Sequence, residues 1–228
     1  MTDLVLRDLA SLTEMKAAED FQRTVWGKDD PADNADLMMA IQHEGGLVAG
    51  AFDRGRMVAF LFAFPTNDPT AQHSHRLGVH PDAQGQGLGV RMKLYQKDWC
   101  LKRGITHVRW TYDPARRANA VLNIHRLGAT ANTYYRDYYG AMEGINAGMP
   151  SDRLLADWDL TRAEGAGVEI VDTVSIPADF ARLVTEDAAK ALSERQRVRA
   201  ALETAFENGL QIAGFDRDAN AYLLARCT

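Results

Sequence analysis

The stretch His73–Met92, HSHRLGVHPDAQGQGLGVRM, gathers residue types of this 228-residue chain that could do chemistry. His73 and His75 lie two positions apart, which on a β-strand puts both imidazoles on one face. A glycine-rich segment, GQGLG, follows from Gly85. A metal, a nucleotide or a coenzyme could use such a combination, and the rest of the sequence has to decide among them.

The glycine spacing argues against the two common nucleotide motifs. A dinucleotide fingerprint needs G-x-G-x-x-G, and its third glycine would fall on Val90. The chain also lacks the P-loop pattern G-x-x-x-x-G-K-[ST]. The pattern that fits is Q-x-x-G-x-G, formed by Gln84, Gly87 and Gly89. Between a strand and a helix, its N–H groups could wrap a pyrophosphate, whereas a plain tight turn is the alternative.

The paired histidines point to proton transfer more than to metal binding. No third ligand is evident, since His80 lies beyond the expected strand and the local carboxylate is Asp82. We therefore expect no metal site. A structural role, with the rings hydrogen-bonded in a half-buried sheet, stays open beside a role as general base. An imidazole of pKa about 6.5 is suited to accept a proton from a substrate near pH 7.

The surrounding pattern predicts strands and helices that would position these groups. The helix over 87–103 is supported by the apolar stripe of Leu88, Met92, Tyr95 and Trp99. Apolar runs and turn residues predict the other elements. The expected strands cover 4–6, 47–52, 57–64, 73–79, 107–111, 130–135 and 154–160, and the other expected helices cover 11–26, 36–43 and 119–127.

Composition bounds the class of protein. A net charge of −5 without a basic run makes nucleic acid an unexpected partner. The longest apolar run, at 57–64, is too short to cross a bilayer, and the first residues lack a signal-peptide core, so we expect no membrane association. Cys100 and Cys227 form no CxxC pattern, which argues against zinc or a disulfide framework and favours the cytoplasm.

The segment RLGVHPDAQGQGLGVRMKL resembles the coenzyme-A motif of the GNAT superfamily of N-acetyltransferases, and residues 4–161 are similar to its fold. WTYDP, NAVLNIHRLGA and the following YYG resemble a bacterial and archaeal subgroup of unassigned substrate. The resemblance implies a mixed α/β (α+β) fold with a mostly antiparallel central sheet and flanking helices. It also implies a transferase that takes acetyl-CoA as co-substrate.

The same resemblance assigns residues to the coenzyme. It implies that the main chain at Leu77, Gly78 and Val79 pairs with the pantetheine arm. It further implies that the pyrophosphate is held by the run Gln84, Gly85, Gln86, Gly87, Leu88 and Gly89. One of Asn119 and Asn123 is expected to hydrogen-bond the pantetheine, and for Asn119 a helix N-cap is the alternative.

HSHRLGV is also similar to a strand of arylalkylamine N-acetyltransferases, which carries two histidines at the same distances before the valine. This likeness implies His75 as the general base, with His73 as the second candidate, and it does not identify the acceptor. Many relatives place a tyrosine acid where this chain has Ile124. Tyr134 is the expected substitute, with a core or pocket-wall role as the alternative. Asp113 could hold an ammonium group or open a turn.

The chain is expected to have an acetyltransferase domain over 1–162, a linker at 163–167, and a C-terminal β-α-β-β appendage over 168–228. EGGLVAGAFDRGRMVAFLFA, from Glu44, is echoed by ENGLQIAGFDRDANAYLLA, from Glu207. The appendage is therefore a candidate half-copy of the same fold, with coincidence between two hairpins as the alternative. It could cover the acceptor cleft or form a homodimer contact.

With this resemblance, the sequence is expected to encode an acyl-CoA-dependent N-acyltransferase that acts on a small-molecule amine by direct attack in a ternary complex. The alternative is a non-catalytic acyl-CoA-binding sensor or scaffold, which the missing acid at Ile124 keeps open.

Overall fold

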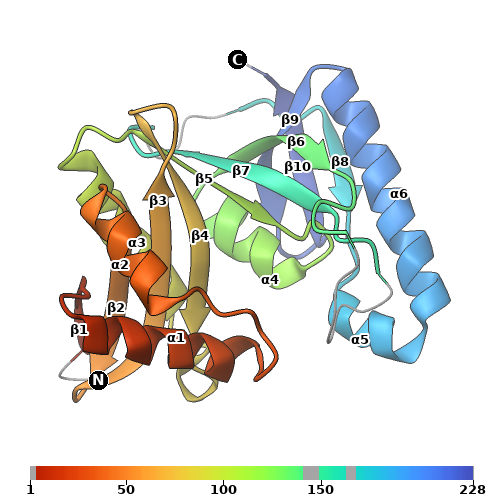
Figure 1. Cartoon of the computed structure of the whole chain (residues 1–228). Helices are drawn as coiled ribbons and strands as arrows, with labels where there is room; N and C mark the ends of the chain where they lie inside the picture. The colour runs from red at the N-terminus through yellow and green to blue at the C-terminus, as the bar shows by residue number, and fades with distance from the viewer. Residues whose placement is uncertain (1–3, 141–148, 163–167, 228) are drawn as a thin grey trace. The chain divides into compact units, whose positions relative to one another are not determined.

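The computed structural model describes residues 4–140, 149–162 and 168–227 (Figure 1). The chain divides into two compact units, Met1–Arg109 and Trp110–Thr228. Both combine helices with mostly antiparallel strands, which confirms the expected mixed α/β class. No helix in the described ranges is long and apolar enough to cross a membrane. The expected linker at 163–167 lies outside the described residues, so the division into 1–162 and 168–228 stays a prediction.

The first unit contains five strands in the order β1-β2-β3-β4-β5. The first three pairings are antiparallel and the last, between β4 and β5, is parallel. Its elements are β1 Leu4–Asp8, α1 Leu12–Trp26, α2 Ala35–His43, β2 Leu47–Asp53, β3 Arg56–Pro65, β4 Ala71–Val79, η1 Pro81–Ala83, α3 Leu88–Leu101 and the start of β5 His107–Tyr112.

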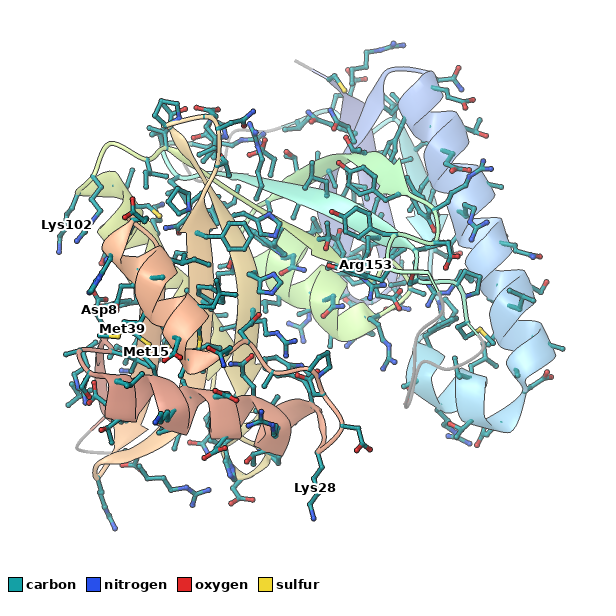
Figure 2. The ribbon with its side chains drawn as sticks, viewed as in Figure 1. Asp8, Met15, Lys28, Met39, Lys102 and Arg153 are labelled. Carbon is teal, nitrogen blue, oxygen red and sulfur yellow. The ribbon has the colours of Figure 1, made fainter. Side chains whose placement is uncertain are left out.

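Helices cover both faces of this sheet. In Figure 1, α1 and α2 lie in front of the strands and α3 lies behind them. Residues Leu47–Ala51 of β2 are all buried, as expected for a strand that is covered on both sides. Met15 of α1 and Met39 of α2 belong to one hydrophobic core with Phe60 and Phe62 of β3 (Figure 2). Strand β4 therefore has a front, toward α1 and α2, and a back, toward α3.

The second unit contains strands in the order β7-β6-β9-β10-β8, and its described pairings are antiparallel. Its elements after β5 are α4 Arg117–Ala120, the π-helical turn η2 Val121–Arg126, β6 Thr130–Tyr135, β7 Arg153–Asp159, β8 Asp172–Ser175, α5 Phe180–Glu186, α6 Ala188–Glu207, β9 Leu210–Asp216 and β10 Ala221–Arg226.

The C-terminal piece has the expected elements but an unexpected pairing. The order β8-α5-α6-β9-β10 repeats the order β1-α1-α2-β2-β3. However, β8 pairs with β10, whereas β1 pairs with β2, and β6 takes the place beside β9. A plain duplication would put β8 next to β9. The half-copy hypothesis therefore stays a prediction about the order of elements and does not extend to the pairing of the first strand.

A buried ion pair ties α6 to the end of β5 within the second unit. The Arg195 guanidinium donates to both carboxylate oxygens of Asp113, at 3.2 and 2.8 Å, and is 2% exposed. It also lies over the Phe180 ring, 4.6 Å from the centroid. The Ala115 N–H donates to Asp113 at 2.9 Å, which makes Asp113 a turn opener. Because its carboxylate is engaged in this way, the structure does not favour Asp113 as a holder of a substrate ammonium.

We predict that Arg195→Ala lowers the free energy of unfolding by about 3 to 5 kcal/mol, because it leaves the Asp113 carboxylate buried without its main partner. Urea denaturation measures the change. Arg182→Ala is the control, since Arg182 pairs with Glu186 across an exposed helix face, and its effect should stay below about 0.5 kcal/mol. Equal losses in the two variants would show that burial of the Arg195 pair is unimportant.

Candidate active site

Strand β4 is paired on both edges only at its start. In the described residues, its ladder with β5 covers Ala71–His73, whereas its ladder with β3 continues to Val79. The His80 N–H donates to the Val58 carbonyl of β3 at 2.9 Å. By strand alternation, the main-chain groups of Leu77 and Val79 then point to the opposite edge. This free edge can pair with an extended ligand that carries amide groups.

Helix α3 begins without a side-chain cap. Its N-cap is Gly87, in the left-handed region at φ 74°, and its first turn holds no acidic residue. The first main-chain bond joins the Arg91 N–H to the Gly87 carbonyl at 3.1 Å, which leaves the N–H groups of the first helical residues for other partners. In contrast, four other helices have side-chain caps, from Ser11, Asn34, Asp179 and Asp187. The start of α3 is therefore suited to an anion such as a pyrophosphate.

The loop before α3 is open. A Cβ atom added to Gly85 or Gly87 would meet no atom within 4 Å, and both residues have positive φ. The Gln84 side chain donates to the Val79 carbonyl at 3.5 Å, and that of Gln86 donates to the Asp82 carbonyl at 3.4 Å. The expected phosphate residues thus follow the free edge of β4 directly.

Two of the expected coenzyme residues have packing roles in the structure. Leu88 is 1% exposed. A Cβ atom on Gly78 would lie 3.0 Å from the Trp26 ring, so the absence of a side chain lets Trp26 pack against β4. Gly78 lies opposite Phe60 of β3, and by alternation its main chain points away from the free edge.

A β-bulge lies at His75. Phe62 of β3 pairs with Arg76 and the next residue, Ala63, pairs with Ser74, so His75 has no partner on β3. A bulge redirects side chains that would otherwise alternate. His75 and Arg76 consequently both reach the segment between α1 and α2. There, His75 Nε2 lies 3.3 Å from Asp33 Oδ1, and Arg76 Nε lies 3.1 Å from Asp33 Oδ2.

The two histidines share the front face of β4, as expected. Their ring centroids are 6.3 Å apart, and both rings lie near Phe64, at 4.8 Å for His73 and 5.6 Å for His75. Burial, together with the charges of His75 and Lys93, lowers the pKa of His73 to about 4. His73 is therefore neutral at pH 7 and a weak base.

His75 has the better geometry for a base, because a carboxylate is placed to orient its imidazole. No group of three potential metal-ligating side chains is found among the residues that the structure describes.

The candidates in the second unit are less suited to catalysis. The Tyr134 hydroxyl donates to Asp152 Oδ2 at 2.7 Å, and Arg199 binds the same carboxylate through two hydrogen bonds. Burial, together with the negative charge of Asp152, raises the pKa of Tyr134 well above its ordinary value. A hydroxyl with a raised pKa is a poorer proton donor to a leaving thiolate. The geometry thus favours the core role that was the alternative for Tyr134.

The helix that contains the two asparagines begins earlier than expected. Its N-cap is Arg116, so the alternative of an N-cap role for Asn119 is wrong. Asn119 is half-buried in α4, while Asn123 and Ile124 are buried in the π-helical turn η2. Such turns are frequent at functional sites.

Sequence reasoning missed Asp33 and a group of buried polar residues on α3. The contact of Asp33 with β4 links positions far apart in the chain, which no local pattern indicates. On α3, Lys93, Gln96 and Cys100 are buried on the side toward β4. Their spacing of three and four marks a second buried stripe, but Lys and Gln are usually exposed.

Comparison with known proteins identifies one family of acetyltransferases. The model of the acetyltransferase (GNAT) family matches residues 12–128, just over half of the chain. No curated protein sequence shows a significant match.

Solved structures share the fold. The ribosomal-protein-S18-alanine N-acetyltransferase from Escherichia coli is 20% identical with a TM-score of 0.58, and the match covers 73% of this chain and 100% of that one. A putative acetyltransferase from Salmonella typhimurium, solved with its cofactor acetyl-CoA, is 18% identical with a TM-score of 0.57, covering 72% and 98%. The aminoglycoside 6′-N-acetyltransferase from Enterococcus faecium is 14% identical with a TM-score of 0.54, covering 70% and 98%.

Two features of the first unit are compatible with the coenzyme that this family uses. The free edge of β4 fits the amide-containing pantetheine arm of acetyl-CoA, and the uncapped start of α3 fits its pyrophosphate. The chain belongs to the GNAT family of N-acetyltransferases, which take their acetyl group from acetyl-CoA.

Proposed function

We propose that this enzyme transfers the acetyl group of acetyl-CoA directly to the amine of a small molecule, within a ternary complex. The observation that carries the proposal is the pair of His75 Nε2 and Asp33 Oδ1, 3.3 Å apart, at the bulge of β4. This pair puts an oriented imidazole on the strand whose free edge suits the coenzyme.

In the proposed complex, the main chain of Leu77 and Val79 pairs with the pantetheine arm. The loop from Gln84 to Gly89 and the start of α3 hold the pyrophosphate. Asn119 or Asn123 adds a hydrogen bond to the pantetheine. A main-chain N–H near Val79 stabilises the negative charge that develops on the thioester oxygen.

His75 takes the proton of the acceptor. Because Asp33 Oδ1 lies 3.3 Å from Nε2, Nε2 carries the proton in this proposal, which leaves Nδ1 of His75 as the basic nitrogen. The amine nitrogen loses its proton to Nδ1, directly or through water, and attacks the thioester carbon. The C–N bond forms, the C–S bond breaks, and the thiolate of coenzyme A leaves. His73 stays neutral beside His75, so it does not repel a cationic acceptor.

A hollow that includes Phe64, whose ring contacts both histidines, suggests the kind of acceptor. It has a volume of about 380 Å³ and is lined by Ala40, Ile41, Glu44, Phe64 and Pro65. Phe64 stacks on His73, and the Glu44 carboxylate lies at the C-terminal end of α2, where the helix dipole also favours a cation. These features, with the net charge of −5, support a small amine with an apolar part and disfavour nucleic acid.

Two further expectations accompany this proposal. Cys100 and Cys227 are both free thiols, which suits the reducing cytoplasm, where we expect the reaction. We also propose that residues 168–228 form a homodimer contact or cover the acceptor site.

An acceptor screen tests the function. The enzyme is incubated with acetyl-CoA and a panel of small amines, and free thiol is measured. Thiol release that depends on an amine supports the proposal. Coenzyme binding by calorimetry without thiol release for any amine would contradict it and favour the sensor alternative.

We predict that His75→Gln lowers kcat by about 10²- to 10⁴-fold at pH 7, the usual contribution of a general base. The deficit should shrink as the pH approaches the pKa of the amine, because the amine then loses its proton without help. His43→Gln is the control, since His43 is exposed at the end of α2 and should not affect the rate. Full activity of His75→Gln at every pH would remove the proposed role.

We also predict that Gly87→Val weakens binding of coenzyme A by at least about tenfold, because a side chain at the left-handed N-cap strains the loop and projects toward the phosphates. Isothermal titration calorimetry measures the dissociation constant. Gly104→Val is the matched control, since Gly104 has nearly the same φ, 75°, just past the other end of α3. Similar affinity losses in both variants would refute a specific role of the Gly87 turn.

A further inference from the structure

A cluster of buried polar side chains lies behind β4. Lys93 Nζ donates to Ser74 Oγ at 2.8 Å and to Gln96 Oε1 at 3.1 Å. Gln96 Nε2 donates to Gln72 Oε1 at 2.7 Å, and the Cys100 thiol lies 3.3 Å from the same oxygen. This cluster, which we call the back cluster, joins two turns of α3 to alternate residues of β4.

The back cluster is costly to bury. Lys93 is 2% exposed, and burial lowers its pKa to about 7. Apolar side chains of similar size would fill the same space without desolvating an amine. The cluster also lies behind the part of β4 whose front carries His73 and His75, and the proposed mechanism gives it no role.

The bulge of β4 is fixed from both faces. Ser74, immediately before His75, is held from the back by Lys93 at 2.8 Å and, more weakly, donates to Gln96 Oε1 at 3.3 Å. Arg76, immediately after His75, is held from the front by Asp30 at 2.5 Å and by Asp33 at 3.1 Å. The unpaired residue between these two attachments is His75, so its direction depends on both.

We propose that Lys93 is a positioning residue: through Ser74 it holds the back of the bulge and so directs His75. Its buried charge, behind the strand that carries His73, also disfavours protonation of that imidazole. This inference rests on the proposed function, because it gives Lys93 its role through the proposed base. Lys93 itself does not contact the reacting atoms in this account.

Several ionisable groups surround this region. On α3, burial raises the pKa of Cys100 to about 12, so its thiol is neutral at pH 7. Asp8 of β1 bonds Tyr95 and Trp99 of the same helix. On the front, His73 faces His75, which pairs with Asp33 beside Arg76. Strand β5 carries His107 and Arg109 alongside the start of β4.

Three variants separate the two parts of the proposal. Lys93→Met removes both the hydrogen bonds and the charge while keeping the length of the side chain. Ser74→Ala removes the attachment and keeps the charge. Lys102→Met is the control, since Lys102 extends into solvent from the end of the same helix (Figure 2).

Two of the measurements, the tautomer of His75 and the titration of His73, need no acceptor amine. Nuclear magnetic resonance of ¹⁵N-labelled imidazoles in the full chain reports the tautomer of His75 and the pH titration of His73. We expect one dominant Nε2–H tautomer of His75 in the parent protein, and a mixture in both Lys93→Met and Ser74→Ala. We expect the pKa of His73 to rise above about 4 only in Lys93→Met, because only that variant loses the positive charge.

With an amine acceptor from the screen, both variants should lower kcat by about tenfold or more through misplacement of the base, while KM for acetyl-CoA stays unchanged. A parent-like His75 tautomer in both variants would overturn the positioning role, and an unchanged titration of His73 in Lys93→Met would overturn the role of the charge. If Lys93→Met does not fold, Ser74→Ala decides the positioning role.

The proposed function fails separately, through the acceptor screen or through an active His75→Gln. In either case the imidazole spectra still report whether Lys93 holds the bulge.

Discussion

The free edge of β4 beyond His73 is the constraint on which the site depends. A strand that is paired on one edge only presents alternate main-chain donors and acceptors at the other, and these need a partner. The chain leaves β4 through η1 and two glycines with positive φ, then enters α3 without a cap. One continuous segment therefore provides an edge for amides and, directly after it, a helix start for phosphates.

The bulge at His75 places the candidate general base on the same strand as this free edge. Under strict alternation, Arg76 would face the same side as Ser74, where the buried ammonium of Lys93 would repel it. The extra residue instead turns Arg76 and His75 together toward Asp33. The Asp33 carboxylate then neutralises the Arg76 guanidinium and orients the His75 imidazole. One carboxylate therefore both supports the bulge and serves the candidate base. Lys93 and Arg76 hold the bulge from opposite faces, which links the back of the sheet to the front.

Much of this arrangement follows from local sequence. The alternation of β4, the shared face of His73 and His75, the stripe on α3 and the open loop around Gly87 were all predictable, because each depends on neighbouring residues. The bulge was not, since HSHR alternates normally and the extra residue appears only in the pairing with β3. The partner of Tyr134, Asp152, lies just before β7, and the partner of Asp113, Arg195, comes from α6, so neither contact is local in the sequence. The repeated hairpin sequence predicted β9 and β10, but not that β8 would pair with β10.

Hydrogen–deuterium exchange of the β4 amides, with and without acetyl-CoA, tests the central claim most directly. The main-chain groups of Leu77 and Val79 face the free edge, whereas Gly78 between them faces β3 and is an internal control. We predict that the coenzyme strongly slows exchange at Leu77 and Val79 and changes exchange at Gly78 little. Unchanged exchange at Leu77 and Val79 when the coenzyme is bound would contradict it.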